Sequence, residues 1–312
     1  MATTYLRRAY SSFAVHILDI PPRLLAFLMF LLVLSLPVTK PTEHILLLLI
    51  QASIMAIFAC SWDLLVGRTG QISLGHALFF GLGAYITALL WFHYDLPVWV
   101  TIPISVLIVT GLAPLIGFPC LRVKGPYLAL VSMALPIIVV SLISYFRDYT
   151  QGERGIAGLP GFFPSLPYGQ RFVAEYFLTL FLLLVSSVIL YRIANSRTGI
   201  VFVSILDDEL GAKACGINVT RYKLMAFTIS GLFAALAGAV SAHLLASGRS
   251  VTTASLDTNL SFMVVIVAIF GGIGTMYGPI IAAYILQLID QYVLVKIWNV
   301  PSEYHMLLFI IV

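Results

Sequence analysis

The sequence predicts an all-α protein, a polytopic transmembrane helical bundle of about nine to ten spans with broken helices. Of its 312 residues, 61% are hydrophobic and 10% are charged, whereas about a quarter of the residues in soluble domains are charged. The apolar segments are long and continuous, and about 20 such residues suffice for a helix to cross the hydrocarbon core. Strands of a membrane barrel would instead alternate over short segments, so this pattern favours helices.

The expected spans are ten apolar runs separated by charged or Gly- and Pro-containing segments. They are Leu24–Val38, Ile45–Val66, Ser73–Phe92, Val98–Phe118, Tyr127–Phe146, Ala174–Ile193, Leu224–Leu245, Leu260–Phe270, Pro279–Val295 and Tyr304–Val312. Arginines precede the first run, but it has no small-residue cleavage site, so we expect an anchored helix and not a removed signal peptide. Residues 1–23 are then a cytoplasmic N-terminal segment, and residues 24–312 are a single transmembrane domain.

The distribution of charge predicts how the chain lies in the membrane. With ten spans and both termini in the cytoplasm, eleven of the 17 Lys and Arg residues fall on the cytoplasmic side, in agreement with the positive-inside rule. Residues 147–173 then form an external loop and residues 194–223 a cytoplasmic loop. The net charge is +4, but the basic residues are scattered among loops without a dense cluster, which argues against nucleic-acid binding. The three cysteines are too few for a disulfide framework or a zinc site.

The external loop is rich in Gly and Pro, which excludes a long helix there. Phe162, Phe163 and Tyr168 give the loop an apolar face. Two interpretations stay open. Either this face docks a partner, or it caps the end of the bundle.

A hydrophilic stretch between apolar runs, Arg192–Lys223, is the most informative feature of the chain. It carries Asp207, Asp208 and Glu209, followed by small residues that end at Gly216. An amphipathic helix held between two spans offers a surface that another protein can grip. The alternative is a solvated loop helix with no partner.

A second polar segment, Gly67–His76, follows the second apolar run. Its glycines permit a break in the helix and a close approach of neighbouring helices. Gln71, Ser73 and His76 place polar groups in apolar surroundings, and they are candidates for lining a translocation path. The other interpretation is that they satisfy backbone amides freed by the break.

Asp63 lies inside an expected span, where an unpaired carboxylate is costly. It is therefore a candidate for the translocation path, with its side chain facing a cavity. An ion pair with Arg68 at the membrane boundary is the favoured alternative. The sequence shows no grouping of nucleophile, base and orienting residue and no metal motif, so we expect a non-catalytic chain without a metal.

Three patterns of glycine and other small residues concern the architecture. Gly75–Leu89 and Gly274–Leu288 share Gly, Ala-Tyr-Ile and Leu at equal offsets, a weak repeat of the kind that builds a central site in transporters. Small residues four apart, such as Ala234 and Gly238, predict tight packing of one helix against another. The run Gly271–Pro279 lacks the Gly-Lys-Ser/Thr ending of a nucleotide-binding loop, so a tight turn suffices to explain it.

Several segments together carry a likeness to a known family and span roughly residues 45–285. They are Asp63–Ala77, Phe80–Tyr85, Gly125–Leu130, Gly152–Gly158, Ala212 with Gly216–Asn218, Tyr222–Phe227, Gly271–Thr275 and Tyr277–Pro279. Through them the chain resembles the permease subunits of branched-chain amino acid ABC importers, and specifically the second of the two paired permeases in such a system.

The resemblance implies that residues 194–223 hold a cytoplasmic coupling helix that meets a groove on an ATP-hydrolysing subunit. The residues that it assigns to this contact are Asp207, Asp208, Glu209, Ala212 and Gly216. The implied partners are a homologous second permease, two subunits that bind ATP and Mg²⁺, a soluble substrate-binding protein and membrane lipid, without nucleic acid. The chain departs from the family pattern at Ile200 and Leu206, where arginines are common, and at Asp63, where Asn is common.

The resemblance further implies import of leucine, isoleucine and valine across the bacterial cytoplasmic (inner) membrane. Urea, other amides and other amino acids are the alternative cargoes. An ion-coupled secondary carrier would require buried carboxylates at the centre of the bundle, and Asp63 is the one serious candidate. An intramembrane enzyme would require clustered Asp, His or Glu residues, and a channel would not need the acidic stretch.

Overall fold

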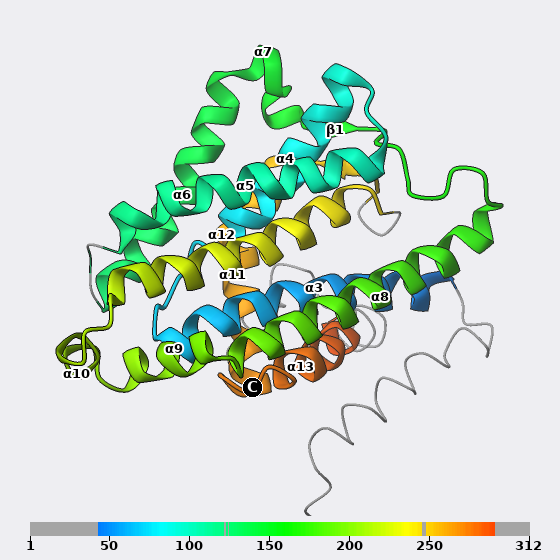
Figure 1. Cartoon of the computed structure of the whole chain (residues 1–312). Helices are drawn as coiled ribbons and strands as arrows, with labels where there is room; N and C mark the ends of the chain where they lie inside the picture. Colours follow the sequence, from blue (N-terminus) through cyan, green and yellow to red (C-terminus); the bar gives the residue numbers. More distant parts are fainter. Residues whose placement is uncertain (1–42, 122, 124, 245–247, 291–312) are drawn as a thin grey trace, which may run out of the picture. The chain divides into compact units, whose positions relative to one another are not determined.

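The computed structural model describes residues 43–121, 123, 125–244 and 248–290 (Figure 1). The predicted segment 1–23 and the first and last predicted spans, Leu24–Val38 and Tyr304–Val312, lie outside the described residues. The described residues belong to one compact unit. They form helices, connecting segments and one two-stranded ladder.

Within the part of the chain that the structure describes, six helices are long and apolar enough to cross a membrane. They are α3 (Glu43–Thr69), α4 (Ala77–Tyr94), α5 (Val98–Cys120), α6 (Pro126–Tyr145), α8 (Tyr168–Ala194) and α11 (Val219–Ala242). The shortest, α4, has 18 residues and extends roughly 27 Å at 1.5 Å per residue, close to the ~30 Å thickness of the hydrocarbon core. An all-α membrane bundle is thus confirmed, whereas nine to ten spans are not.

Shorter helices connect these six or lie beside them. They are α7 (Arg147–Thr150), α9 (Arg197–Asp207), α10 (Glu209–Ala214), α12 (Thr258–Gly271) and α13 (Gly278–Leu288), with 3₁₀ turns η2 (Gly152–Arg154) and η4 (Thr253–Leu256). α12 and α13 coincide with two of the predicted spans. α12 has 14 residues and rises only about 21 Å, which is too short to cross the core alone.

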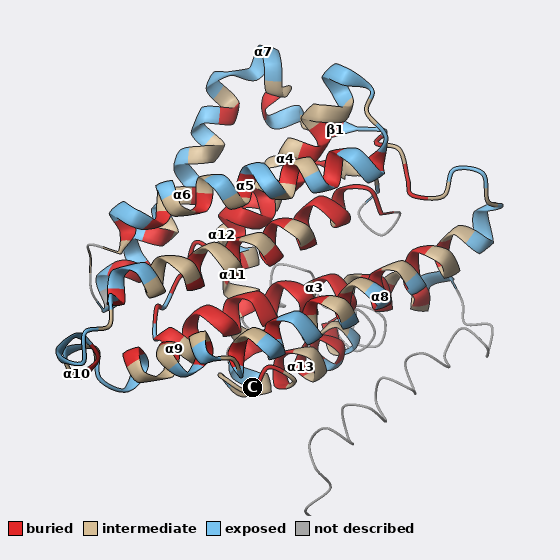
Figure 2. Cartoon of the chain, viewed as in Figure 1, coloured by how far each residue is buried: buried red, intermediate tan, exposed pale blue. Residues whose placement is uncertain are grey.

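α3 is the central helix of the described bundle. It packs against α8, α11, α12 and α13, and Figure 2 shows it buried over most of its length. α6 is the opposite case, because Leu130, Ile137 and Leu142 are half or more exposed. Large exposed apolar surfaces mark contact with lipid or with another protein, so α6 lies at the periphery.

α4 and α11 approach each other backbone to backbone. A Cβ atom added at Gly83 would lie 2.3 Å from the carbonyl oxygen of Ala235, and one added at Gly238 would lie 1.9 Å from that of Phe80. Only glycine fits at such distances. The predicted tight packing of the helix that carries Gly238 is therefore confirmed.

One end of the bundle, called the β1 end below, is closed by the predicted external loop. Strand β1 (Ile156–Ala157) pairs antiparallel with β2 (Ser250–Val251), which follows α11. Phe162 is buried and packs edge-on against Trp99 and His243. For Phe162 the structure thus supports the interpretation of a cap. The end of the bundle opposite the β1 end is called the α10 end.

Candidate functional site

A break separates α3 from α4. Residues 70–76 are not helical, so α4 begins at Ala77 and the predicted start at Ser73 is too early. The Ala77 amide donates to Ser261 Oγ at 2.9 Å, and the Ser73 carbonyl accepts from Trp62 Nε1 at 2.7 Å. Side chains on α12 and α3 therefore satisfy backbone groups that a continuous helix would have paired internally.

His76 ties this break to two helices. It is fully buried, with Nε2 3.0 Å from Ser61 Oγ and 3.3 Å from Ser230 Oγ, and its ring stacks on Phe58. Both hydroxyls donate to backbone carbonyls. Nε2 therefore carries the imidazole proton and donates it to them. The break is in this way joined to α3 and α11.

Asp63 holds the turn between α12 and α13 against α3. Its side chain is fully buried. Oδ1 accepts from the amide of Gly274 at 2.6 Å, and Oδ2 accepts from the amide of Met276 at 3.2 Å. The ion pairs of the described residues do not include Asp63 with Arg68, so the favoured ion pair is not confirmed, and the observed partners of the carboxylate are backbone amides.

The acidic stretch forms two short helices that meet at a corner, and not one helix. α9 ends at Asp207 and α10 begins at Glu209, with Asp208 extended between them. Asp208 Oδ1 accepts from the amide of Leu210 at 2.9 Å, which is the bond of a residue that caps a helix N-terminus. The exposed carboxylate of Asp208, which the resemblance assigned to the contact with an ATP-hydrolysing subunit, therefore already stabilises the corner within this chain.

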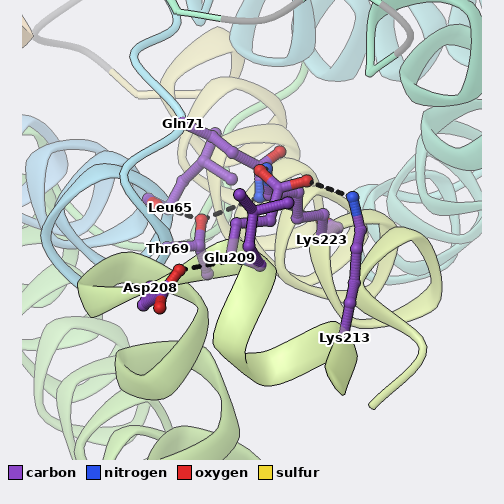
Figure 3. Close-up of polar contacts among 8 residues, drawn as sticks. Leu65, Thr69, Gln71, Asp208, Glu209, Lys213 and Lys223 are labelled. Atoms are coloured by element: carbon purple, nitrogen blue, oxygen red, sulfur yellow. Dashed lines mark hydrogen bonds and ion pairs between the residues drawn. The ribbon is translucent and has the colours of Figure 1, made fainter. Parts of the chain in front are cut away.

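Glu209 joins the corner to α11. Its carboxylate receives Lys213 Nζ at 2.8 Å and Lys223 Nζ at 2.6 Å; these three residues are called the Glu209 clamp (Figure 3). Gln71 Nε2 donates to the carbonyl of Lys223 at 3.3 Å and to Thr69 Oγ1 at 2.8 Å. An unbroken series of polar contacts thus runs from α10 through the first turns of α11 to the break and the end of α3.

The remaining residues assigned to the coupling contact differ in exposure. Ala212 is buried beside Ile205 and Val219, so it packs the corner onto its own chain. Asp207 and Gly216 are exposed, as is Leu210, at 74%. The outward surface of the corner therefore includes an apolar side chain that the sequence analysis did not single out.

Replacing Glu209 with glutamine is expected to loosen α10. Hydrogen bonds from Lys213 and Lys223 lower the pKa of Glu209 from 4.5 to about 2. Since the folded pKa is depressed, the clamp is fully formed above pH 4.5 and is lost only as the pH falls towards about 2. At pH 7, backbone amides of α10 should exchange about two- to thirty-fold faster in Glu209→Gln, the effect of losing two partly exposed ion pairs worth about 0.2–1 kcal/mol each.

Hydrogen exchange followed by mass spectrometry measures this effect, because amide exchange reports local opening. Asp207→Asn is the matched control, since it neutralises an exposed carboxylate two residues away that lies outside the clamp. Equal exchange of the α10 amides in the two variants would contradict the assignment. So would a wild-type protection of these amides, relative to their intrinsic exchange rate, that changes between pH 5 and pH 8.

A cavity of about 380 Å³ lies between α3, α4, α11 and α13 and reaches β2 and η4. Its polar lining consists of Gln51, Gln287, Ser241, Ser250, Thr252 and Ser255, and its larger apolar side chains are Ile50, Ile54, Met55, Phe58, Phe80, Leu244 and Leu260. Gln287 Nε2 donates to Gln51 Oε1 at 3.0 Å across the wall. None of its lining residues is ionisable.

The four predicted path residues, Asp63, Gln71, Ser73 and His76, do not line this cavity. His76 lies behind Phe58, which does. The signal that would have found the lining was Gln51 within an otherwise apolar run, since polar side chains inside membrane helices are costly and mark functional positions. Among the described residues, no group of three His, Cys, Asp or Glu side chains could hold a metal ion.

Comparison with known proteins identifies the family. Residues 44–312 match the sequence profile described as the permease component of the branched-chain amino acid transport system. The chain belongs to this family. The predicted resemblance is therefore confirmed, and the break, the corner and the cavity described above are features of a permease.

Several curated relatives are similar to this permease. The high-affinity branched-chain amino acid transport system permease protein LivM of Escherichia coli (strain K12) is 30% identical over 257 residues, which cover 75% of this chain and 60% of LivM. The ribose import permease protein RbsC of Haemophilus influenzae is 25% identical over 272 residues, 85% of this chain and 81% of RbsC. The permease thus spans about 60% of the length of LivM. No solved structure matches the chain.

Proposed function

We propose that this permease is the membrane-spanning subunit of an ATP-driven importer and forms the path for branched-chain amino acids delivered by a soluble binding protein. It lies in the bacterial cytoplasmic membrane with its N-terminus and the α10 end in the cytoplasm. The partners are a homologous permease and two ATP-binding subunits, which bind ATP and Mg²⁺ and carry out hydrolysis. The similarity to LivM over 75% of this chain is the observation that carries the proposal.

The α9–α10 corner supports the proposed coupling to ATP hydrolysis. It presents Asp207 and Leu210 outward and is fastened inward through the Glu209 clamp and the buried Ala212. A rigid corner of this kind transmits a push as a rigid-body movement. Because Gln71 bonds to the carbonyl of Lys223, the push reaches the break between α3 and α4 and from there the helices around the cavity.

The cavity supports a small neutral or zwitterionic cargo. Its volume of about 380 Å³ falls within the roughly 300–1,000 Å³ that is typical of small-molecule sites. Its aliphatic and aromatic walls match the side chains of leucine, isoleucine and valine, while Gln51 and Gln287 offer amide dipoles. Without ionisable groups in the lining, a zwitterion is held weakly, which suits a path that must release its cargo.

Ribose is the second candidate cargo, because RbsC aligns with 85% of this chain. The hydroxyl and amide groups of the cavity are able to bind sugar hydroxyls. The apolar majority among the larger lining side chains favours the aliphatic amino acids.

Reconstitution of the permease with its partner permease, ATP-binding subunits and binding protein in proteoliposomes tests the proposal. Binding protein loaded with leucine should stimulate ATP hydrolysis and uptake, and binding protein supplied with ribose should not. Uptake that persists without the ATP-binding subunits would instead support a secondary carrier. Stimulation by ribose alone would transfer the proposal to a sugar importer.

Replacing Leu210 with aspartate is expected to weaken association with the ATP-binding subunits by about 30-fold or more, the loss typical of a buried apolar anchor worth about 2 kcal/mol at an interface. The Leu210 side chain is 74% exposed and is not needed inside this chain. Co-purification and a titrated pull-down measure the loss.

Tyr94→Asp is the matched control, because Tyr94 is 71% exposed at the end of α4, away from the corner. Both variants should insert and purify as the wild type does. If Leu210→Asp retains its ATP-binding subunits as well as Tyr94→Asp does, the corner is not the coupling surface.

A further inference from the structure

A second cavity, of about 290 Å³, lies beneath the α9–α10 corner. It is bordered by the break, residues 121, 123 and 125 between α5 and α6, the start of α6, the end of α9 and the first turns of α10 and α11. Gln71 lines it from the break, Leu128 from α6 and Leu206 from α9, while Glu209 and Lys223 face it as an ion pair. Gln71 and Glu209, which the sequence assigned to the path and to the coupling contact, line this cavity, but neither assignment gives the space itself a ligand.

The chemistry of the walls selects a particular ligand. Glu209 and Lys223 are 27% and 19% exposed in their side chains, and each keeps hydrogen-bonding capacity beyond their mutual contact. A ligand with a single net charge would meet one like charge at this pair, whereas a zwitterion satisfies both members. Gln71 Oε1, which is buried without a hydrogen-bond partner in the described part of the chain, adds an unused acceptor at the cavity wall.

The apolar part of the lining accounts for the rest of such a ligand. Leu128 and Leu206 border the space together with Leu121 and Ile205, which suits a short aliphatic side chain. A free aliphatic amino acid combines this side chain with an ammonium group and a carboxylate. The volume of the cavity, close to the lower end of the roughly 300–1,000 Å³ range of small-molecule sites, excludes much larger ligands.

We propose that this cavity binds a free zwitterionic aliphatic amino acid from the cytoplasmic side, and that occupancy slows the importer. The inference rests on the proposed function, in which the released cargo is such an amino acid. The cavity lies where the corner, the Glu209 clamp and the break meet. A ligand bound there holds the corner in one position relative to the break. Imported amino acid that accumulates in the cytoplasm therefore opposes the movement that would release more of it there.

Uptake into proteoliposomes that contain ATP tests the proposal with the complete importer. Initial uptake of labelled leucine from the binding protein is compared with and without unlabelled leucine trapped inside. Trapped leucine at ten times its dissociation constant should slow uptake by about ten-fold, since about one site in eleven then stays free. Trapped ribose and the 2-keto acid of leucine, which lacks the ammonium group, should slow it by less than about two-fold under the same mass-action relation.

Two variants locate the effect, each compared with its own rate without trapped leucine. Lys223→Met removes the charge and Leu206→Trp fills the space, so both should abolish the slowing. Arg221→Met, which neutralises an exposed residue outside the cavity, should keep it. If the importer that carries Lys223→Met does not assemble, the test rests on Leu206→Trp, through the ratio of its uptake with trapped leucine to its uptake without it.

The outcomes separate this inference from the proposed function. Robust uptake that trapped leucine does not slow, equal slowing in all variants, or equal slowing by the keto acid overturns the ligand site and leaves the importer intact. Absence of uptake under every condition overturns the proposed function, and the ligand site with it.

Discussion

Replacing Asp63 with alanine is expected to destabilise the permease by about 2–6 kcal/mol, because one buried and one partly buried backbone amide each lose an acceptor at a cost of about 1–3 kcal/mol. The carboxylate of Asp63 receives the amides of Gly274 and Met276 at 2.6 and 3.2 Å in a fully buried position. The turn between α12 and α13 has no room to move closer, since a Cβ atom at Gly67 would lie 2.5 Å from the Gly274 nitrogen. We therefore expect the turn to detach from α3.

A thiol-reactive fluorescent dye measures this loss during thermal unfolding in detergent. Cys60 is buried next to the turn and its Sγ contacts the Met276 carbonyl at 3.4 Å, so it reports opening at this place. The exposed Cys215 and the buried Cys120 are first replaced by serine and alanine, so that Cys60 alone is labelled. The midpoint of Cys60 labelling should fall well below that of the parent protein.

Asp257→Ala is the control for the same substitution at an exposed position. Asp257 caps α12 by accepting from the amide of Asn259 at 3.1 Å, and loss of such a cap costs about 0.5–2 kcal/mol. Asp63→Ala should therefore lower the midpoint more than Asp257→Ala does. If the two variants unfold alike, the amides of the turn find other acceptors and Asp63 is not what holds it.

Asp63 also shows where sequence reasoning stops. A carboxylate inside an apolar run signals a partner, and the nearest candidate along the chain was Arg68. The actual partners are amides more than 200 residues away, and such contacts leave no local pattern. The same limit explains α4, whose start was placed at Ser73 because the bond from Ala77 to Ser261 is invisible to hydropathy.

Long apolar runs were predicted well, because burial and lipid contact act on the whole run. The expected span Val98–Phe118 became α5 (Val98–Cys120), and Ile45–Val66 became α3 (Glu43–Thr69). The corner at Asp208 was readable in principle, since an Asp that precedes a Glu is a common helix start. The pairing of Gln51 with Gln287 was not, because it depends on how α13 lies against α3.

Replacing Gly238 with alanine is expected to destabilise the permease by about 1–3 kcal/mol, the usual cost of overpacking a closely packed interface. The added Cβ atom would lie 1.9 Å from the carbonyl oxygen of Phe80 and 2.6 Å from its carbonyl carbon. Backbone atoms of α4 cannot rotate away as a side chain does, so α4 and α11 must separate. The loss should exceed the roughly 0.5–1 kcal/mol that alanine gains over glycine within a helix.

Gly111→Ala in α5 isolates that gain, because nothing lies within 4 Å of a Cβ atom at this position. Gly111→Ala should thus raise the midpoint of thermal unfolding of the permease, and Gly238→Ala should lower it. Separation of α4 from α11 also moves two walls of the 380 Å³ cavity, since Phe80 and Ser241 line it from these helices. Uptake by Gly238→Ala should therefore fall even at temperatures where it stays folded. Equal midpoints for the two variants would show that α4 and α11 tolerate a methyl group between them, and that the glycine contact does not set their spacing.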